Sequence, residues 1–280
     1  METDPSICLG TSRLWRSIAI MDPIVTPAAS VNIERIPDVA NFHQAMSAKH
    51  SEPVDLSVNF KGFPVTSFCI PERYAPYLDK VLVSNGMIKD RLQCLAGYIV
   101  ELYEREGIKE VSIMCVLKGG FKFFSDLIEE MQQTIWARKT ELCITVEFIR
   151  VKSYTDTTSG EVNIRSIDNA MPIKDKNILV VDDICDTGKT MIKLCDYLYE
   201  NGAKTVKSCC LLLKHTCLNV GYRPHFTGFV IPDEFIVGYA IDYNECFRDL
   251  LHICSINEKA KKSFAVHSNG ELGTLPAASL

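Results

Sequence analysis

The fold is decided by Ile178-Leu179-Val180-Val181-Asp182-Asp183-Ile184-Cys185-Asp186-Thr187-Gly188-Lys189-Thr190, a stretch that joins an apolar run to three carboxylates and a Gly-Lys-Thr turn. The run 178–181 has no polar alternation, as is typical of a parallel strand buried on both faces. Apolar residues recur at helical spacing in 191–200, so the turn before them is predicted to be a helix start. Asp182 and Asp183 are therefore expected at the carboxyl end of a strand, where open α/β sheets bind ligands.

The predicted helix start is suited to binding a phosphate. The first N–H groups of a helix lack intrahelical partners and carry roughly +0.5 elementary charge, so an anion binds there without a cationic side chain. Gly188 lets the anion approach the backbone closely. Ionised Asp182 and Asp183 can accept hydrogen bonds from vicinal ribose hydroxyls. A nucleotide-binding P-loop would need glycine at 183, and solvated acids at a strand end are the other alternative. The stretch indicates a sugar-phosphate site.

Composition narrows the class of protein. The 280 residues are 47% hydrophobic and carry a net charge of −5, which predicts one main globular domain and argues against nucleic acid as a partner. No apolar run approaches the roughly 20 residues that a membrane-spanning helix needs, so no membrane partner is expected. The 12 cysteines include no C-x-x-C pair, and no secretory signal is visible. Free thiols and a cytoplasmic location are therefore expected.

Strands and helices are predicted to alternate along the chain. The strand-like runs are 111–117, 143–148, 178–181, 206–213 and 235–240, and the helix-like runs are 87–106, 121–136 and 191–200. This alternation predicts an α/β fold with a mostly parallel sheet flanked by helices. The polar stretch 155–169 has no periodicity and is expected to be a mobile active-site loop. Residues 1–58 are expected to be a poorly ordered extension, 59–262 the folded domain and 263–280 a flexible tail.

Five segments of the chain, in order, resemble motifs of the type I phosphoribosyltransferases. The stretch quoted above resembles their phosphoribosyl diphosphate motif, and the others are LKGGFKF (117–123), VEFIRVKSY (146–154), LLLK (211–214) and VGYAIDYNE (237–245). The flanking residues narrow the resemblance to the hypoxanthine-guanine phosphoribosyltransferases. That resemblance implies a small hood beside the sheet, a homodimer or homotetramer, and Mg²⁺-dependent purine salvage. Hypoxanthine or guanine would displace diphosphate from phosphoribosyl diphosphate, giving IMP or GMP.

The resemblance also implies a role for each matching residue. It assigns the phosphoribosyl group to Asp182, Asp183, Thr187, Gly188, Lys189 and Thr190. It assigns diphosphate to Lys118, Gly119, Ser153, Tyr154 and Arg248. It assigns the purine to Lys214, Phe235, Ile236 and Asp242, with Asp186 as the catalytic residue that moves a proton at N7. It implies that Mg²⁺ is bound by Asp242, Asp182 and Asp183.

Alternatives and departures qualify these assignments. Without the resemblance, the alternatives are an ordinary strand-to-helix turn at Lys118, a core position for Phe235, and solvated surface charges at Asp242 and Arg248. In this family the peptide bond that enters the lysine can be cis. Asp182 stands where glutamate is usual, and His215 stands where arginine is usual. Either change could weaken activity or shift base preference, so a catalytically weak, nucleotide-sensing homologue of the same fold is the alternative function.

Overall fold

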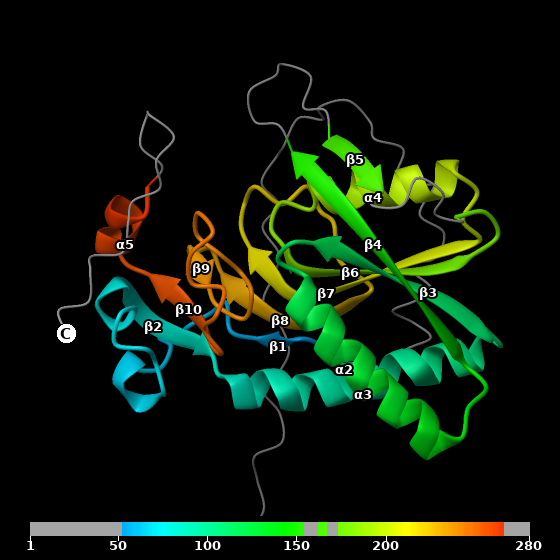
Figure 1. The fold of residues 1–280 in the computed structure, drawn as a ribbon, viewed down its shortest axis with the longest axis horizontal. Coiled ribbons are helices and arrows are strands. Elements are labelled where there is room, and N and C mark those ends of the chain that lie inside the picture. Colours follow the sequence, from blue (N-terminus) through cyan, green and yellow to red (C-terminus); the bar gives the residue numbers. More distant parts are fainter. Residues whose placement is uncertain (1–51, 154–161, 167–172, 266–280) are drawn as a thin grey trace, which may run out of the picture. The chain divides into compact units, whose positions relative to one another are not determined.

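The computed structural model describes residues 52–153, 162–166 and 173–265 of the chain (Figure 1). These residues form a large, mostly parallel sheet with helices on both sides and a small antiparallel sheet. The α/β class, the parallel sheet and the hood expected from the sequence are confirmed. No helix in the described ranges is long and apolar enough to cross a membrane.

The large sheet has its described strands in the order β1 (Val54–Asp55), β8 (Phe226–Pro232), β7 (Thr205–His215), β6 (Asn177–Cys185), β3 (Glu110–Leu117), β4 (Cys143–Ser153) and β5 (Val162–Ser166). Neighbouring strands are parallel, apart from the antiparallel pair β4 and β5. Cys115 of β3 lies opposite Val181 of β6, and Asp182 lies opposite Cys210 of β7. The carboxyl ends of β3, β6 and β7 therefore meet at one end of the sheet.

Among the described residues, three long helices cover the large sheet: α2 (Asn85–Arg105), α3 (Phe121–Arg138) and α4 (Lys189–Glu200). Figure 1 shows α2 and α3 on one side of the sheet and α4 on the other. Met191, Leu194 and Leu198 recur every three or four residues along α4, so they share one face. This face packs against Ile178 and Val180 of β6 in a common hydrophobic core. The packing fixes the start of α4 beside the end of β6.

The small sheet forms the hood, with strands in the order β2 (Leu78–Val83), β10 (Ile253–Ile256) and β9 (Ile236–Val237). It is joined by helix α5 (Glu258–Ser263) and by the 3₁₀ helices η2 (Val65–Ser67) and η3 (Ala75–Tyr77). Its core is aromatic: the ring of Phe247 lies 4.7 Å from the rings of both Tyr74 and Phe264. The hood therefore has a hydrophobic core of its own, and Phe235 is the residue directly before its strand β9.

Two of the sequence predictions about elements are wrong. The run 235–240 is predicted to be a strand of the parallel sheet, but only Ile236–Val237 is a strand, and it belongs to the hood. The next three residues, Gly238, Tyr239 and Ala240, have positive φ angles of 97°, 53° and 74°, which end the strand. The stretch 155–169 is predicted to be a loop, but 162–166 forms β5, paired with β4. The remainder of that stretch lies outside the described residues.

Candidate active site

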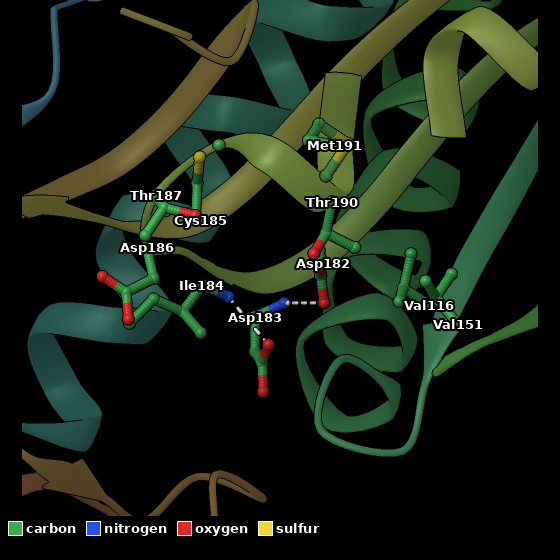
Figure 2. Close-up of a pocket in the computed structure, with 11 residues that line it drawn as sticks. Val116, Val151, Asp182, Asp183, Ile184, Cys185, Asp186, Thr187, Thr190 and Met191 are labelled. Carbon is green, nitrogen blue, oxygen red and sulfur yellow. Dashed lines mark hydrogen bonds between the residues drawn. The ribbon is translucent and has the colours of Figure 1, made fainter. Parts of the chain in front are cut away.

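A cavity of about 240 Å³ lies where β6 ends and α4 begins (Figure 2). Its lining combines carboxylates, hydroxyls and an apolar wall: Val116, Val151, Asp182, Asp183, Ile184, Cys185, Asp186, Thr187, Gly188, Thr190 and Met191. Most residues predicted to bind a sugar phosphate therefore lie around one cavity. Lys189 does not line it, and its side chain is exposed.

The turn into α4 is shaped by a glycine that no other residue can replace easily. Gly188 has a φ of +82°, and an added Cβ would lie 2.5 Å from Cβ of Tyr222. The backbone N–H of Val220 donates to the carbonyl oxygen of Thr187 at 3.0 Å, which fixes the turn from outside. Helix α4 starts at Lys189, so its first N–H groups have no intrahelical acceptor. The cavity rim therefore offers backbone donors and a positive helix end to an anion.

Asp182 and Asp183 are held by the backbone that follows them. The N–H of Asp183 donates to Oδ1 of Asp182 at 3.0 Å, and the N–H of Ile184 donates to Oδ1 of Asp183 at 2.8 Å (Figure 2). Burial, followed by the nearby charge of Asp183, raises the pKa of Asp182 well above its usual range. Burial also raises the pKa of Asp183, although hydrogen bonds and the charge of Arg248 oppose the rise. The pair therefore resists carrying two negative charges, which the sequence analysis did not anticipate.

The Lys118-Gly119-Gly120 turn packs directly on these acids. The peptide bond between Leu117 and Lys118 is cis, as the resemblance implied. A Cβ at Gly119 would lie 1.8 Å from Oδ2 of Asp183, and a Cβ at Gly120 would lie 2.6 Å from the carbonyl oxygen of Val116. Side chains are therefore excluded at both positions, and the backbone of the turn comes close to the carboxylates.

Arg248 contacts several polar groups of residues 240–245. Its Nη2 lies 2.8 Å from Oδ1 of Asp242 and 3.1 Å from Oε2 of Glu245, and its Nη1 donates to the carbonyl oxygen of Ala240 at 2.7 Å. Glu245 Oε1 in turn accepts from Lys118 Nζ at 2.9 Å. Both of these side chains are about half exposed. Lys118, Arg248 and Asp242 are thus linked through Glu245, which the sequence analysis did not single out although it lies three residues before Arg248.

Lys214 lies between the carboxylate of Asp186 and the ring of Phe235, in contact distance of both. Lys214 Nζ is 3.3 Å from Oδ2 of Asp186, 3.8 Å from Oδ1 of Asp233 and 6.0 Å from the ring centroid of Phe235. The Phe235 side chain is 58% exposed, so it is not the core residue that the local alternative predicts. Lys261 Nζ, which the sequence analysis missed, lies 4.9 Å from the same ring. An exposed aromatic ring flanked by cations is a platform for a flat, electron-rich ligand.

The remaining predicted residues that the structure describes do not line the cavity. Ile236 is 8% exposed in β9. Ser153 ends β4, and Tyr154 lies outside the described residues. His215 Nδ1 lies 3.1 Å from Oγ of Ser57, so this departure from the family pattern pairs with the segment after β1.

Comparisons with known proteins agree with this geometry. The sequence model of the phosphoribosyl transferase domain matches residues 84–244. The hypoxanthine-guanine phosphoribosyltransferase of Schistosoma mansoni is 48% identical over 209 residues, covering 74% of this chain and 73% of that protein. That of Sus scrofa is 42% identical over 218 residues, covering 78% of this chain and 99% of that protein. The chain belongs to the hypoxanthine-guanine phosphoribosyltransferase family.

Two solved structures of related enzymes have a fold similar to that of this chain. A crystal structure of the Schistosoma mansoni hypoxanthine-guanine phosphoribosyltransferase in complex with IMP has a TM-score of 0.66 and 44% identity, covering 76% of this chain and all of that one (100%). A structure of Trypanosoma cruzi hypoxanthine phosphoribosyl transferase has a TM-score of 0.60 and 26% identity, covering 66% of this chain and 95% of that one. The resemblance seen in the sequence motifs is confirmed.

Proposed function

We propose that this protein transfers the phosphoribosyl group of phosphoribosyl diphosphate to hypoxanthine or guanine, forming IMP or GMP and releasing diphosphate in purine salvage. One observation carries the proposal beyond family membership. Asp186 lines the sugar-phosphate cavity and also lies 3.3 Å from Lys214 beside the exposed Phe235 ring. A single carboxylate therefore faces both the ribose side and the base side of the site, where the new bond must form.

The cavity supplies the phosphoribosyl site. The backbone donors at Thr187, Gly188, Lys189 and Thr190 bind the 5-phosphate at the helix start. Asp182 and Asp183 accept hydrogen bonds from the ribose hydroxyls. Their raised pKa values mean that the pair also holds a proton more readily than free aspartates do, which limits repulsion of the incoming phosphates.

The Lys118 turn and Arg248 supply the diphosphate site. Lys118 and the backbone at Gly119 form a concave anion site, and Arg248 approaches the same place from the 238–250 segment. Lys118 Nζ donates to Glu245 Oε1 at 2.9 Å, and because an ammonium group carries three N–H donors it can bind diphosphate at the same time. Ser153 and Tyr154 close over the diphosphate in this proposal and exclude water that would hydrolyse the activated ribose.

The purine lies on Phe235, with Lys214 donating to its 6-oxo group. Adenine has a 6-amino group there, which would leave the cation without an acceptor, so it is rejected. The backbone of Ile236 and the residue Asp242 contact the edge of the purine. Asp186 moves the proton at N7 as the purine attacks C1 of the ribose.

Mg²⁺ is the cofactor in this proposal, and the donor set fits it. Magnesium binds through one or two carboxylates together with waters and substrate phosphates. Asp182, Asp183 and Asp242 offer such oxygens, yet no cluster of three metal-binding side chains is preformed in the described part of the chain. The ion would therefore be held jointly with diphosphate, whose developing negative charge it neutralises.

A second copy of the chain is the expected partner, as a homodimer or homotetramer. Phe121 on α3 and Val146 and Phe148 on β4 are 49%, 43% and 41% exposed. Apolar side chains on adjoining elements form the kind of surface that subunit contacts cover. We infer that the protein works in the cytoplasm, without a nucleic-acid or membrane partner.

The test is nucleotide formation from phosphoribosyl diphosphate and Mg²⁺ with hypoxanthine, guanine, xanthine or adenine, followed by chromatography. We expect turnover with the first two bases, and a fall in kcat of about 100-fold or more for Asp186→Asn. Asp90→Asn, an exposed change on α2, is the matched control and should leave kcat unchanged. Nucleotide binding without turnover on any base would refute the proposal and favour the nucleotide-sensing alternative.

A further inference from the structure

The phenol of Tyr239 joins the two chain segments that carry the diphosphate-binding groups. Its side chain is buried, and its hydroxyl donates to Oδ2 of Asp126 on α3 at 2.6 Å. Lys122 donates to both carboxylate oxygens of Asp126 at 2.6 and 2.7 Å and lies 5.4 Å from the Tyr239 ring centroid. Burial, followed by the hydrogen bond with Asp126, raises the pKa of Tyr239, so the phenol remains a donor.

The backbone around Tyr239 is held in an uncommon conformation. Tyr239 and Ala240 have φ angles of +53° and +74°, a region that residues with side chains rarely occupy. The N–H of Tyr239 donates to the carbonyl oxygen of Leu250 at 2.7 Å, and the N–H of Ala240 donates to that of Arg248 at 3.1 Å. Such a conformation persists only where surrounding contacts enforce it. The buried phenol is one of those contacts, since it ties the turn to α3.

Both ends of this connection lead to diphosphate-binding groups. On one side, the carbonyl oxygen of Ala240 accepts from Arg248 Nη1 at 2.7 Å, and Arg248 pairs with Asp242. On the other side, α3 begins at Phe121 and has Gly120, the last residue of the Lys118 turn, as its N-cap. Asp126 lies little more than one helical turn from that start. A shift between Tyr239 and Asp126 would therefore change the distance between Arg248 and the Lys118 turn.

We propose that Tyr239 and Asp126 are positioning residues that set the spacing of the two halves of the diphosphate site, an inference that rests on the proposed function. The ion pair between Lys118 and Glu245 also joins these segments, but both of its side chains are about half exposed, so it constrains their spacing less than a buried hydrogen bond does. The bond between Tyr239 and Asp126 uses no ligand-binding group, so it persists in the complex. Its loss should weaken diphosphate binding while leaving Lys214 and Phe235 able to bind purine.

The test compares two buried phenols. Tyr239→Phe keeps the ring and removes the hydroxyl. Tyr103→Phe on α2 is the matched control, because the Tyr103 hydroxyl is buried without a hydrogen-bond partner among the described residues. For each variant we would measure KM for phosphoribosyl diphosphate, KM for hypoxanthine, the calorimetric Kd of Mg²⁺-diphosphate, and Tm. Asp126→Asn is a second variant that weakens the same bond from the other side.

We expect Tyr239→Phe to raise KM for phosphoribosyl diphosphate and Kd for Mg²⁺-diphosphate about tenfold, equivalent to about 1.4 kcal/mol. KM for hypoxanthine should change less than about twofold, and Tyr103→Phe should change none of these binding constants. A lower Tm with unchanged KM values, or an equal rise in both KM values, would overturn the proposal.

Three further outcomes are decisive. If Tyr239→Phe does not fold, the same split between the two KM values in Asp126→Asn decides the matter. If the unaltered protein binds Mg²⁺-diphosphate but turns over no base, the proposed function is wrong, while the Kd comparison still tests Tyr239. In a double variant that combines Tyr239→Phe with Asp126→Asn, effects on the binding constants that merely add would contradict a shared hydrogen bond.

Discussion

Replacing Gly119 with alanine should remove most of the activity while leaving the protein folded. The added Cβ would lie 1.8 Å from Oδ2 and 2.8 Å from Cγ of Asp183, although real Cβ atoms essentially never come within 3.0 Å of such atoms. The carboxylate must therefore retreat by more than about 1 Å. It can do so, because it is the end of a short side chain, but it would lose the hydrogen bond from the N–H of Ile184 at 2.8 Å.

Gly119→Ala is expected to lower activity more than it lowers folding stability. A hydrogen bond to a charged group contributes about 1.5 to 3 kcal/mol, which bounds the loss of folding stability. Misplacing a substrate-binding group by about 1 Å can lower the rate about 100-fold. We therefore expect kcat/KM for phosphoribosyl diphosphate to fall about 100-fold in Gly119→Ala, with cooperative unfolding retained.

The assay pairs nucleotide formation with calorimetric unfolding, and the control is Gly97→Ala. Gly97 lies inside α2, and an added Cβ there meets no atom within 4 Å. The same chemical change should stabilise the protein by about 0.5 to 1 kcal/mol and leave kcat/KM unchanged. Activity of Gly119→Ala within about threefold of the parent would refute the reasoning, because the carboxylate position would then not matter.

Three further outcomes are expected. Burial raises the pKa of Asp182, so the folded protein opposes ionisation of this carboxyl group. The protonated carboxyl group therefore favours the folded state below the unfolded pKa of about 4, and this stability is lost as pH rises through the folded pKa. The Tm of Asp182→Asn relative to that of the parent should therefore increase as pH rises above about 4, and a constant difference would contradict this. Burial lowers the pKa of His225 to about 4, so stability should fall by up to about 3 kcal/mol as pH drops from about 6.5 to 4. His225→Asn should unfold with a flatter pH profile, and an unchanged profile would exclude His225 as the cause. Phe235→Leu should raise KM for hypoxanthine about tenfold, because base stacking is lost, with little change in Tm since the ring is exposed. An unaltered KM would show that the purine binds elsewhere.

The sequence predicted those helices and strands in which the spacing of apolar residues matches the face that is buried in the fold. The apolar run 178–181 and the helix after it were found because both periodicities are uninterrupted. Strand β8 was missed because Gly228 interrupts its apolar pattern. A Cβ at Gly228 would lie 2.5 Å from the carbonyl oxygen of Leu211, so glycine is needed there for strand packing. That reason becomes visible only once β7 and β8 are neighbours.

The candidate site was predictable where its residues follow strands. Lys118, Asp186 and Lys214 each lie near the carboxyl end of a predicted strand, and a parallel sheet brings such ends together. The sequence could not show that Glu245 links Lys118 to Arg248, because the pairing depends on a turn with positive φ angles. The raised pKa values of the acid pair were also hidden, since they follow from burial under a distant turn.

The pairing of β2 with β10 has a consequence for how the protein is made. Val81 lies opposite Cys254, so the hood is assembled from segments near the two ends of the described chain. Contacts between such distant residues form slowly, whereas β3, α3 and β4 can associate from neighbouring sequence. During synthesis, which proceeds from the N-terminus, β2 must wait for nearly the whole domain to emerge before it finds its partner. A nascent chain would therefore hold a structured sheet before it has a complete platform for a purine.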